Sequence, residues 1–499
     1  MTSVDPKELL IAMVTRQPDV PVLIAGDHIV THRQFLTLVE HAEAKLDQLG
    51  VTPGSTVGVV LPNSLELLVL THAILWRKAI VFPIAPTVTP AELTQLVGPT
   101  TLALCIVPPF LSSLTATSFA AKVVQVTTDY ASLDLIVVTS DSTLVPSLVA
   151  PFSAGNPYVV RLVSSGTSGA YKQVLHTAAA LFAMGANLTT AYHYRIGAER
   201  AMMLVPPSHL IGFGYLMSPI YFGWTNIITN GFVPQQFIAE LQHHRATLLF
   251  ATPFIFETLA KVAPADLDLS HLQKAVSSGG PLSEAVYRSF TSRCRASLHI
   301  MYGSTEATIV TARIDDGNYS GTDVGKPVAD MIVKVFDDQK NELPTGSVGN
   351  VAVSGPTVIS GYFNNDRANV ELFVNNFLLM GDRGFLDATG NLHIVGRTNL
   401  VISVGGLKVD IMEVEAVLAG HPSVAEALVY GVSQASTEVV KAAVVCTDTT
   451  LTTEALMQHC RDHLSDYKVP KEIIFVPQLP RSATGKVVRG DVAALLSKK

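Results

Sequence analysis

The residue types of an anion-binding loop occur in the stretch Val163-Ser-Ser-Gly-Thr-Ser-Gly-Ala-Tyr-Lys-Gln173. An apolar run leads here into a segment rich in glycine and hydroxyl groups, which ends at Lys172. Glycines let the backbone turn its N–H groups towards an anion, hydroxyl groups add donors, and the lysine supplies a positive charge. The Walker A pattern does not fit these residues. Taken alone, the stretch is as consistent with an ordinary Ser/Gly turn as with a phosphate-binding loop.

Four further clusters follow along the chain. Tyr302-Gly-Ser-Thr-Glu306 comes directly after an apolar strand, where its hydroxyl and carboxylate could reach a phosphate and its Mg²⁺. Met380-Gly-Asp382 and Gly396-Arg397 lie on either side of a predicted hairpin, and a Gly485-Lys486 pair lies near the C-terminus. Each cluster taken alone is more often a polar turn with a solvated charge.

The elements that must position these clusters alternate between strands and helices. This alternation, with continuously apolar strands, predicts an α/β fold of layered subdomains whose strands are covered on both faces. One helix is expected over Leu65 to Trp76. The expected strands are Val57–Leu61, Ala79–Ile84, Leu102–Val107, Val123–Val126, Tyr158–Val163, Leu248–Ala251, Lys274–Ser277 and Ser297–Met301.

The texture of the sequence changes in its last third. Asp323 to Asp338 and Gly349 to Tyr362 predict turn-rich antiparallel strands, as in a small barrel-like part or side sheet. A compact α+β unit is expected from Asn399 onward, with a helix that opens at the capping-box pattern Asp410-Ile-Met-Glu413 and ends at Gly420. We therefore predict a large N-terminal body over residues 1–398 and a small, mobile C-terminal domain over residues 399–499.

Composition excludes several classes of protein. The chain has 499 residues, of which 48% are apolar and 15% charged, with a net charge of −7, so no basic surface for nucleic acid is expected. No membrane span is expected either, because charged residues and a histidine interrupt the most apolar stretch, Leu65 to Pro83. The N-terminus has no apolar signal core, and the four cysteines form no metal-binding spacing. These features predict a cytoplasmic protein with reduced thiols and leave its oligomeric state open.

The order and spacing of the five clusters resemble the adenylate-forming superfamily. This superfamily comprises acyl- and aryl-CoA ligases, adenylation domains and beetle luciferases, and the resemblance runs from Leu23 to Arg489. It implies an ATP-dependent enzyme that activates a carboxylic acid as an acyl-adenylate, with Mg²⁺, and transfers the acyl group to the thiol of CoA. Supporting motifs are Leu61-Pro-Asn-Ser64, Pro206-Pro-Ser-His209, Ser278-Gly-Gly-Pro-Leu282, Gly361-Tyr362 and Tyr467-Lys-Val-Pro470.

The resemblance implies a role for each cluster in the body. Tyr302 would pack on the adenine of ATP, with Gly279 and Gly280 on its other face. Thr305 would contact the α-phosphate, and Glu306 would hold Mg²⁺. The β- and γ-phosphates would be held by Ser164, Ser165, Gly166, Thr167, Ser168, Gly169 and Lys172.

The later clusters are implied to complete the reaction. Asp382 would accept both ribose hydroxyls, assisted by Arg397. The C-terminal domain would turn about a hinge at Asn399 to admit the thiol. The pantetheine tunnel would be lined by Gly405 and Gly406. Lys486 would bridge the substrate carboxylate and the α-phosphate, so the implied catalytic residues are Lys486, Thr305, Glu306 and His209.

The acid substrate is constrained by one missing charge. Amino-acid-activating members carry an aspartate shortly after the position of His209, and this chain has no acidic residue there. An unpaired ammonium group is costly to bury, so an α-amino acid is disfavoured. His209 itself either lines the pocket or is a hydrogen-bonded core histidine. An apolar, partly aromatic slot for an aryl or medium acyl acid is expected from Gly212, Phe213, Gly214, Thr252, Phe254, Ser278 and Gly279.

Several positions depart from the family's usual pattern. Tyr171 and Gln173 stand where proline and glycine are usual, and Asn399 and Ser403 replace charged residues at the hinge and beyond it. Ile300 stands where an amide often reads the adenine. Three alternatives to a CoA ligase therefore remain open: an enzyme that loads a phosphopantetheinyl carrier protein, a catalytically weak nucleotide-binding paralogue, and an enzyme with an unusual acceptor. Because only ten residues follow Arg489, we expect the acceptor to come from outside the chain.

Overall fold

The computed structural model divides the chain into two compact units, which we describe separately. The larger unit comprises Met1–Gly321, Gly325–Ile332 and Val353–Leu378, and the smaller comprises Thr322–Val324, Val333–Ala352 and Leu379–Lys499. The structure describes residues 5–86, 88, 93, 96–97, 102–109, 122–128, 133–140, 158–165, 171–229, 231–264, 267–397, 401–404, 407–434, 437–448, 450–464, 466–479, 481 and 487.

The first sheet of the larger unit has seven strands in the order β7-β6-β5-β3-β4-β8-β9. Its five inner strands pair in parallel, and β7 and β9 are antiparallel at the edges. The central strands are apolar and buried, as expected for a parallel sheet covered on both faces. The strands are β3 (Thr56–Val60), β4 (Ile80–Ile84), β5 (Leu104–Val107), β6 (Lys122–Thr128), β7 (Leu133–Ser140), β8 (Tyr158–Ser165) and β9 (Tyr171–Thr177).

The second sheet of this unit runs in the order β2-β1-β11-β10-β12-β13-β14-β15-β16. The strands from β1 to β14 in this order pair in parallel, and β2, β15 and β16 are antiparallel additions at the two ends. The strands are β1 (Pro21–Ala25), β2 (His28–Thr31), β10 (Arg200–Met203), β11 (Thr225–Ile228), β12 (Leu248–Ala251), β13 (Lys274–Ser277), β14 (Leu298–Ser304), β15 (Thr308–Arg313) and β16 (Asp323–Pro327).

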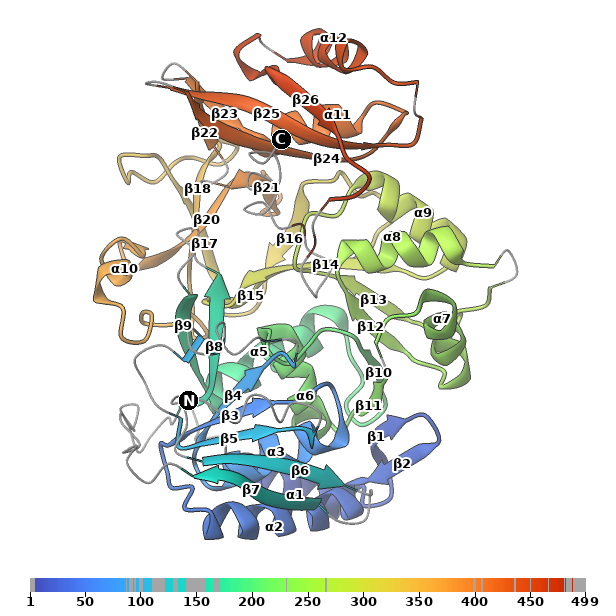
Figure 1. Ribbon diagram of the computed structural model, residues 1–499, viewed down its shortest axis with the longest axis vertical. Helices are drawn as coiled ribbons and strands as arrows, with labels where there is room; N and C mark the ends of the chain where they lie inside the picture. Colours follow the sequence, from blue (N-terminus) through green and yellow to red (C-terminus); the bar gives the residue numbers. More distant parts are fainter. Residues whose placement is uncertain are drawn as a thin grey trace. The chain divides into compact units, whose positions relative to one another are not determined.

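Helices cover both sheets, and Figure 1 shows α7, α8 and α9 together beside β12 and β13. Their starts follow from local sequence: Ser64 caps α3 through a hydrogen bond from the Leu67 N–H, and Thr31 and Gln34 form a capping box on α2. The helices are α1 (Pro6–Arg16), α2 (His32–Gln48), α3 (Leu65–Trp76), α5 (Ala178–Tyr192), α6 (Leu210–Phe222), α7 (Pro234–His243), α8 (Pro253–Val262), α9 (Glu284–Cys294) and α10 (Asp366–Val370), with the short strand β19 (Phe373–Val374) after α10.

The smaller unit is an α+β arrangement. Its core packs α11 and α12 against the sheet β24-β25-β26, around Val414, Leu418, Leu456 and Cys460. The elements are β17 (Ile332–Phe336), β18 (Gly349–Ser354), β20 (Phe377–Leu386), β21 (Leu392–Arg397), β22 (Val401–Val404), β23 (Leu407–Asp410), α11 (Ile411–Ala419), β24 (Val424–Gln434), β25 (Thr437–Cys446), α12 (Thr453–His463), the 3₁₀ turn η2 (Asp466–Lys468) and β26 (Glu472–Phe475).

The predicted fold class is confirmed. The expected strands Leu248–Ala251 and Lys274–Ser277 and the expected helix Leu65–Trp76 have the predicted bounds. The expected barrel-like part is not a closed barrel among the described strands: β17, β18, β20 and β21 follow one another in an open sheet. The predicted boundary between residues 398 and 399 lies outside the described residues and stays a prediction.

All four cysteines are free thiols; Cys105, Cys294 and Cys460 are buried, and burial raises the pKa of Cys105 to about 12. Such thiols are protonated and unreactive near neutral pH. Among the described residues, no helix combines the length and the apolar character that crossing a membrane requires.

Candidate active site

The carboxyl ends of three parallel strands in the larger unit meet at one edge of the sheet. Ala251 at the end of β12 pairs with Ser277 at the end of β13, which pairs with Ile300 of β14. Thr252 and Ser278 therefore follow their strands at the same level, and the Ser278 N–H donates to the Ala251 carbonyl at 3.1 Å. Loops at this edge of a parallel sheet are where α/β proteins bind ligands.

The predicted adenine and metal motif forms the end of β14 and the turn into β15. A β-bulge separates Tyr302 from Gly303, and a Cβ on Gly303 would lie only 1.9 Å from the Thr308 carbonyl oxygen. Thr308 has a φ of +61°, which is unusual for a β-branched residue. Bulges of this kind redirect side chains, so this strained turn determines where Thr305 and Glu306 point.

The predicted phosphate loop connects β8 and β9, and we call this pair of strands the phosphate hairpin. Ser164 pairs with Lys172 at the end of the hairpin, and the residues between Ser165 and Tyr171 lie outside the described part of the chain. The Lys172 ammonium lies 4.8 Å from the centre of the Tyr362 ring, within cation–π range. The positive charge of Lys172 therefore lies near the end of the strands that the predicted phosphate loop connects.

Tyr362 connects the hairpin to the metal motif. Its hydroxyl donates to Glu306 Oε1 at 2.9 Å. Burial and the neighbouring Glu306 carboxylate raise the pKa of Tyr362 well above its usual value, against a smaller opposing effect of a hydrogen bond with Ser164. Tyr362 therefore stays a neutral hydrogen-bond donor, placed between residues that the sequence assigned to two different clusters.

His176 on β9 holds the backbone of the metal motif. Its Nε2 lies 2.6 Å from the Thr305 carbonyl oxygen, so this nitrogen carries the proton and donates. Burial lowers the pKa of His176, although the Thr305 hydrogen bond and the Glu306 charge work in the opposite direction. The sequence analysis missed this residue. Its position in β9, on the same face as Lys172 and Val174, was the available signal.

Gln173 and Arg161 anchor the phosphate hairpin to the backbone of Leu96 and Val97. Gln173 Nε2 donates to the carbonyls of Leu96 and Val97, both at 3.2 Å, and an Arg161 guanidinium nitrogen donates to Val97 at 2.7 Å. Arg161 is buried, with its guanidinium 4.7 Å from the Phe82 ring, and burial lowers its pKa to about 10. The guanidinium is thus still charged at neutral pH. Gln173, a departure from the family's pattern, has defined partners here.

Asp382 and Arg397 lie opposite each other in the smaller unit. They form a paired position of strands β20 and β21, and Arg397 Nε donates to Asp382 Oδ1 at 2.7 Å. Asp382 is buried, whereas about half of the Arg397 side chain is exposed. Gly381 has a φ of +71°, a conformation that favours glycine. The pair predicted to act together on a ribose is therefore already formed.

The glycines predicted to line the acid pocket are in close contact with protein atoms. A Cβ on Gly212 would lie 2.2 Å from the Pro206 carbonyl oxygen, and one on Gly214 would lie 2.4 Å from the Met184 methyl group. Both glycines therefore allow close packing of α6. Phe213 is fully buried, and His209 stands exposed at the start of α6. The lining of the pocket stays a prediction.

Two hydroxyls near the strand ends have no hydrogen-bond partner within the described residues. They belong to Thr252 and Ser277, and both are buried. Gly279 has a φ of +83°, and a Cβ there would lie 3.7 Å from Thr252, so its backbone conformation rather than space favours glycine. The predicted residues that lie outside the described part of the chain are Gly166, Thr167, Ser168, Gly169, Asn399, Gly405, Gly406 and Lys486.

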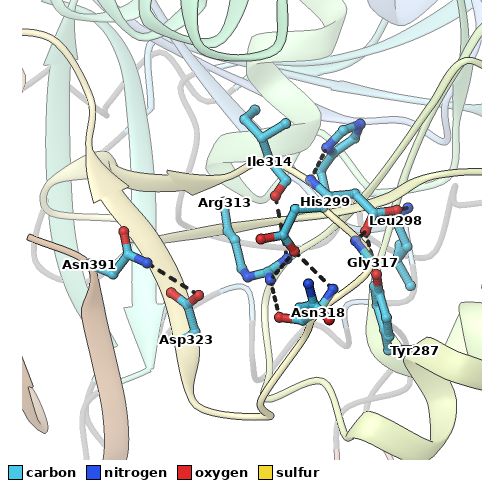
Figure 2. A network of polar contacts seen from close by, with 11 residues as sticks. Tyr287, Leu298, His299, Arg313, Ile314, Gly317, Asn318, Asp323 and Asn391 are labelled. Carbon is cyan, nitrogen blue, oxygen red and sulfur yellow. Dashed lines mark hydrogen bonds and ion pairs between the residues drawn. The ribbon is translucent and has the colours of Figure 1, made fainter. Parts of the chain in front are cut away.

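A second polar network in the larger unit surrounds Arg313 (Figure 2). The buried Arg313 guanidinium donates to Asp316 Oδ1 at 2.7 Å and to the Asn318 carbonyl at 2.5 Å, and lies 5.4 Å from the Tyr319 ring centre. The neighbouring Asp315 accepts from the Tyr287 hydroxyl and from the backbone N–H of Leu298, while its own N–H donates to His299 Nδ1 at 2.9 Å. These groups use their hydrogen-bonding capacity on one another and close the turn after β15.

Two family models match the chain. One is described as "AMP-binding enzyme" and matches residues 11–363; the other, "AMP-binding enzyme C-terminal domain", matches residues 413–486. Among relatives of known name, a long-chain-fatty-acid–CoA ligase of Escherichia coli is 29% identical over 96% of this chain and 92% of its own length. A 2-succinylbenzoate–CoA ligase of Bacillus licheniformis is 27% identical over 95% of this chain and 96% of its own.

Solved structures resemble the whole chain. ATP-bound MatB from Rhodopseudomonas palustris has a TM-score of 0.86 at 22% identity and covers 99% of both chains, which shows the common fold. The amide bond synthetase McbA from Marinactinospora thermotolerans has a TM-score of 0.85 at 25% identity, over 98% of this chain and 99% of its own.

Proposed function

The chain belongs to the AMP-binding enzyme family, and on that premise we propose that it activates an aryl or medium acyl acid and transfers the acyl group to CoA. At the coarser level it is an AMP-forming acid–thiol ligase, as its CoA-ligase relatives are. In such a reaction the acid's carboxylate attacks the α-phosphorus of ATP and displaces pyrophosphate. The thiol sulfur then attacks the acyl carbon and displaces AMP.

The observation that carries the proposal is the meeting of Lys172, Tyr362 and Glu306 in the larger unit. A cation at a glycine- and hydroxyl-rich hairpin and a carboxylate beside it provide what a polyphosphate and its counter-ion need. A carboxylate substrate is already a nucleophile, so the reaction requires positioning and charge stabilisation rather than a general base.

Glu306 fits the Mg²⁺ that this chemistry implies. Magnesium is usually bound through one or two carboxylates together with substrate phosphates, and Glu306 uses one oxygen for Tyr362, which leaves the second for a cation. When bound, Mg²⁺ would offset the negative charge of the phosphates. His176 holds the Thr305 carbonyl, so the backbone that presents Thr305 and Glu306 stays in place while ligands come and go.

The remaining roles belong to Asp382 and Arg397 in the smaller unit and to Lys486. Asp382, oriented by Arg397, has the acceptor oxygens that two ribose hydroxyls require. Lys486 would bring the acid's carboxylate and the α-phosphate together, since two anions need a cation between them. Replacement of Lys486 by alanine should stop adenylation, while a preformed acyl-adenylate should still react with CoA.

The acid class rests on the residues at the start of α6. The sequence from Pro206 to Gly214 contains no acidic residue to pair an ammonium group. Phe213 is buried in α6, and the Tyr215 ring packs 4.4 Å from that of Phe250 on β12, so the surroundings are apolar and aromatic. An uncharged aryl or acyl chain suits such surroundings.

CoA has two competitors as the acceptor. One is an amine, because the amide bond synthetase McbA also resembles this chain, and the other is a phosphopantetheinyl carrier protein. The proposal is tested by acid-dependent release of pyrophosphate from ATP, with aryl, medium-chain, long-chain and amino acids, and with CoA, an amine or a carrier protein as acceptor. We expect release with an aryl or medium acyl acid and a thioester only with CoA. Formation of an amide would identify an amine rather than CoA as the acceptor. Pyrophosphate release with amino acids alone would refute the proposed acid class.

A further inference from the structure

We propose that Tyr362 is a positioning residue that couples the metal-binding carboxylate to the phosphate hairpin, so that Mg²⁺ and the nucleotide phosphates bind cooperatively through one side chain. The inference rests on the proposed function, since it concerns how ATP and its metal are held. It assigns separate tasks to the two ends of the side chain, the hydroxyl and the ring.

The hydroxyl orients Glu306. A carboxylate on a turn can rotate, and a hydrogen bond to one of its oxygens fixes the direction of the other. The Tyr362 hydroxyl supplies this bond to Oε1 at 2.9 Å. Charge-assisted hydrogen bonds of this kind are stronger than neutral ones. This bond thereby restricts the orientations that Oε2 can take before a cation binds.

The ring supports Lys172. The ammonium lies 4.8 Å from the ring centre, so the lysine is attracted to the aromatic face and its long chain is less free to move. Its positive charge is thus held near the end of the hairpin, where Lys172 pairs with Ser164. The same aromatic side chain therefore contacts the cation for the phosphates and the carboxylate for the metal.

Tyr362 is itself fixed strongly enough to position others. The Asn369 side chain accepts from the Tyr362 N–H at 2.7 Å and donates to its carbonyl at 3.1 Å. Backbone hydrogen bonds tie the neighbouring residues to Glu306 and to Gln173, which follows Lys172: Ile359 N–H donates to the Glu306 carbonyl at 3.0 Å, and Phe363 N–H to the Gln173 carbonyl at 2.8 Å. Tyr362 is also only 8% exposed, which limits the access of solvent to the side chain.

The chain offers a matched control. Tyr319 also lies under a cation, 5.4 Å from Arg313, and its hydroxyl lies 2.8 Å from the Leu282 carbonyl. Tyr319 contacts Arg313 of the second polar network, and neither Tyr319 nor Arg313 is assigned to ATP. Tyr319→Phe and Tyr319→Leu therefore remove the same groups as Tyr362→Phe and Tyr362→Leu, from a site with no assigned ligand.

The experiment measures the dissociation constant of ATP by calorimetry on the full-length protein, once with Mg²⁺ and once with EDTA. The ratio of the two constants is the metal-dependent gain. Tyr362→Phe keeps the ring and should reduce this gain about tenfold, with ATP affinity in EDTA unchanged. Tyr362→Leu should lose the same gain and, in addition, weaken ATP binding in EDTA about threefold.

Each outcome decides a separate statement. A wild-type protein that binds no ATP overturns the proposed function. Wild-type binding with an unchanged metal-dependent gain in Tyr362→Phe overturns the coupling alone. Equal losses with Mg²⁺ and with EDTA in Tyr362→Phe, or the same changes in the Tyr319 variants, would show a general structural effect and overturn it as well. Thermal melting is measured for every variant. It verifies in particular that Tyr362→Phe, which preserves the ring, is folded.

Discussion

Two groups of residues in the larger unit contain the same kinds of side chain but differ in how their charges are paired. The phosphate-site group comprises Tyr362, Lys172, Glu306 and His176, and the Arg313 group comprises Tyr319, Arg313, Asp316 and His299. Each has a cation over a tyrosine, an acid and a buried histidine.

The groups differ in how their charges are used. Arg313 is paired with Asp316 and with the Asn318 carbonyl, so its donors are spent within the turn. Lys172 forms no ion pair with a carboxylate of the described residues, and its only described attraction is the Tyr362 ring. A charge that the protein leaves without a counter-charge is available to a ligand, whereas one that is fully bonded stabilises the fold. The difference predicts that equivalent substitutions will affect binding in one group and stability in the other.

The acids should show the largest difference. Glu306→Gln keeps the shape of the side chain but removes the charge for Mg²⁺, so acid-dependent pyrophosphate release should fall on the order of 10³-fold. Asp316 is largely exposed, so Asp316→Asn should change unfolding free energy by less than about 1 kcal/mol and leave pyrophosphate release within about twofold. Retention of a tenth or more of the activity in Glu306→Gln would remove the assigned metal role.

The histidines distinguish the groups by pH. Burial lowers the pKa of His299 from 6.5 to about 4, and nearby charges modify this effect. Because the folded pKa is below the unfolded one, the stability from neutral His299 is complete above pH 6.5 and declines as the pH falls towards 4. The loss for this one side chain should be about 2 kcal/mol between about pH 7.5 and about pH 5.

His299→Asn offers the test, since its amide oxygen can replace Nδ1 as acceptor for the Asp315 N–H without titrating. Urea unfolding at the two pH values should show a smaller acid loss in this variant than in the wild type, with activity near neutral pH unchanged. His176→Asn should instead lower activity at neutral pH, because His176 holds the Thr305 carbonyl. An equal acid loss in wild type and His299→Asn would contradict the assignment.

The sequence predicted the strands and helices whose formation depends on residues close together in the chain. Leu248–Ala251 and Lys274–Ser277 have the predicted bounds because short apolar runs between turn signals fit buried parallel strands. The order of the polar clusters carried the family resemblance from which the nucleotide site is predicted, although Asp382 lies within β20 rather than after a strand end.

Contacts between distant residues could not be predicted. Tyr362 and Glu306 are separated by 56 positions, and only the fold brings the hydroxyl to the carboxylate. Gly214 illustrates a different limit, because a small residue is equally suited to lining a pocket and to admitting the Met184 side chain. The packing of α6 decides between them, and a single sequence does not specify it.

The cations give the next difference. Lys172→Met keeps the length of the side chain and should raise the KM for ATP between about 10-fold and 100-fold, since a charge-assisted bond to phosphate is lost. Arg313→Met should leave this KM unchanged and lower the free energy of unfolding by about 2 kcal/mol, because the Asn318 and Ile314 carbonyls lose a donor. Steady-state kinetics and urea unfolding of both variants measure the two effects. A raised KM in Arg313→Met would mean that the two groups are not functionally separate.

The smallest effect concerns Gln173, where glycine is usual in the family. Gln173→Ala removes two hydrogen bonds to the Leu96 and Val97 carbonyls, so it should lower the free energy of unfolding by about 1 kcal/mol and raise the KM for ATP about threefold. Gln242 donates to the Asp268 carbonyl at 3.2 Å on an exposed surface, and Gln242→Ala is the matched control with neither effect. If Gln173→Ala lowers stability but not ATP affinity, the glutamine belongs with the Arg313 group as a purely structural residue. If both quantities change, this chain has replaced a flexible position of the phosphate hairpin by an anchored one.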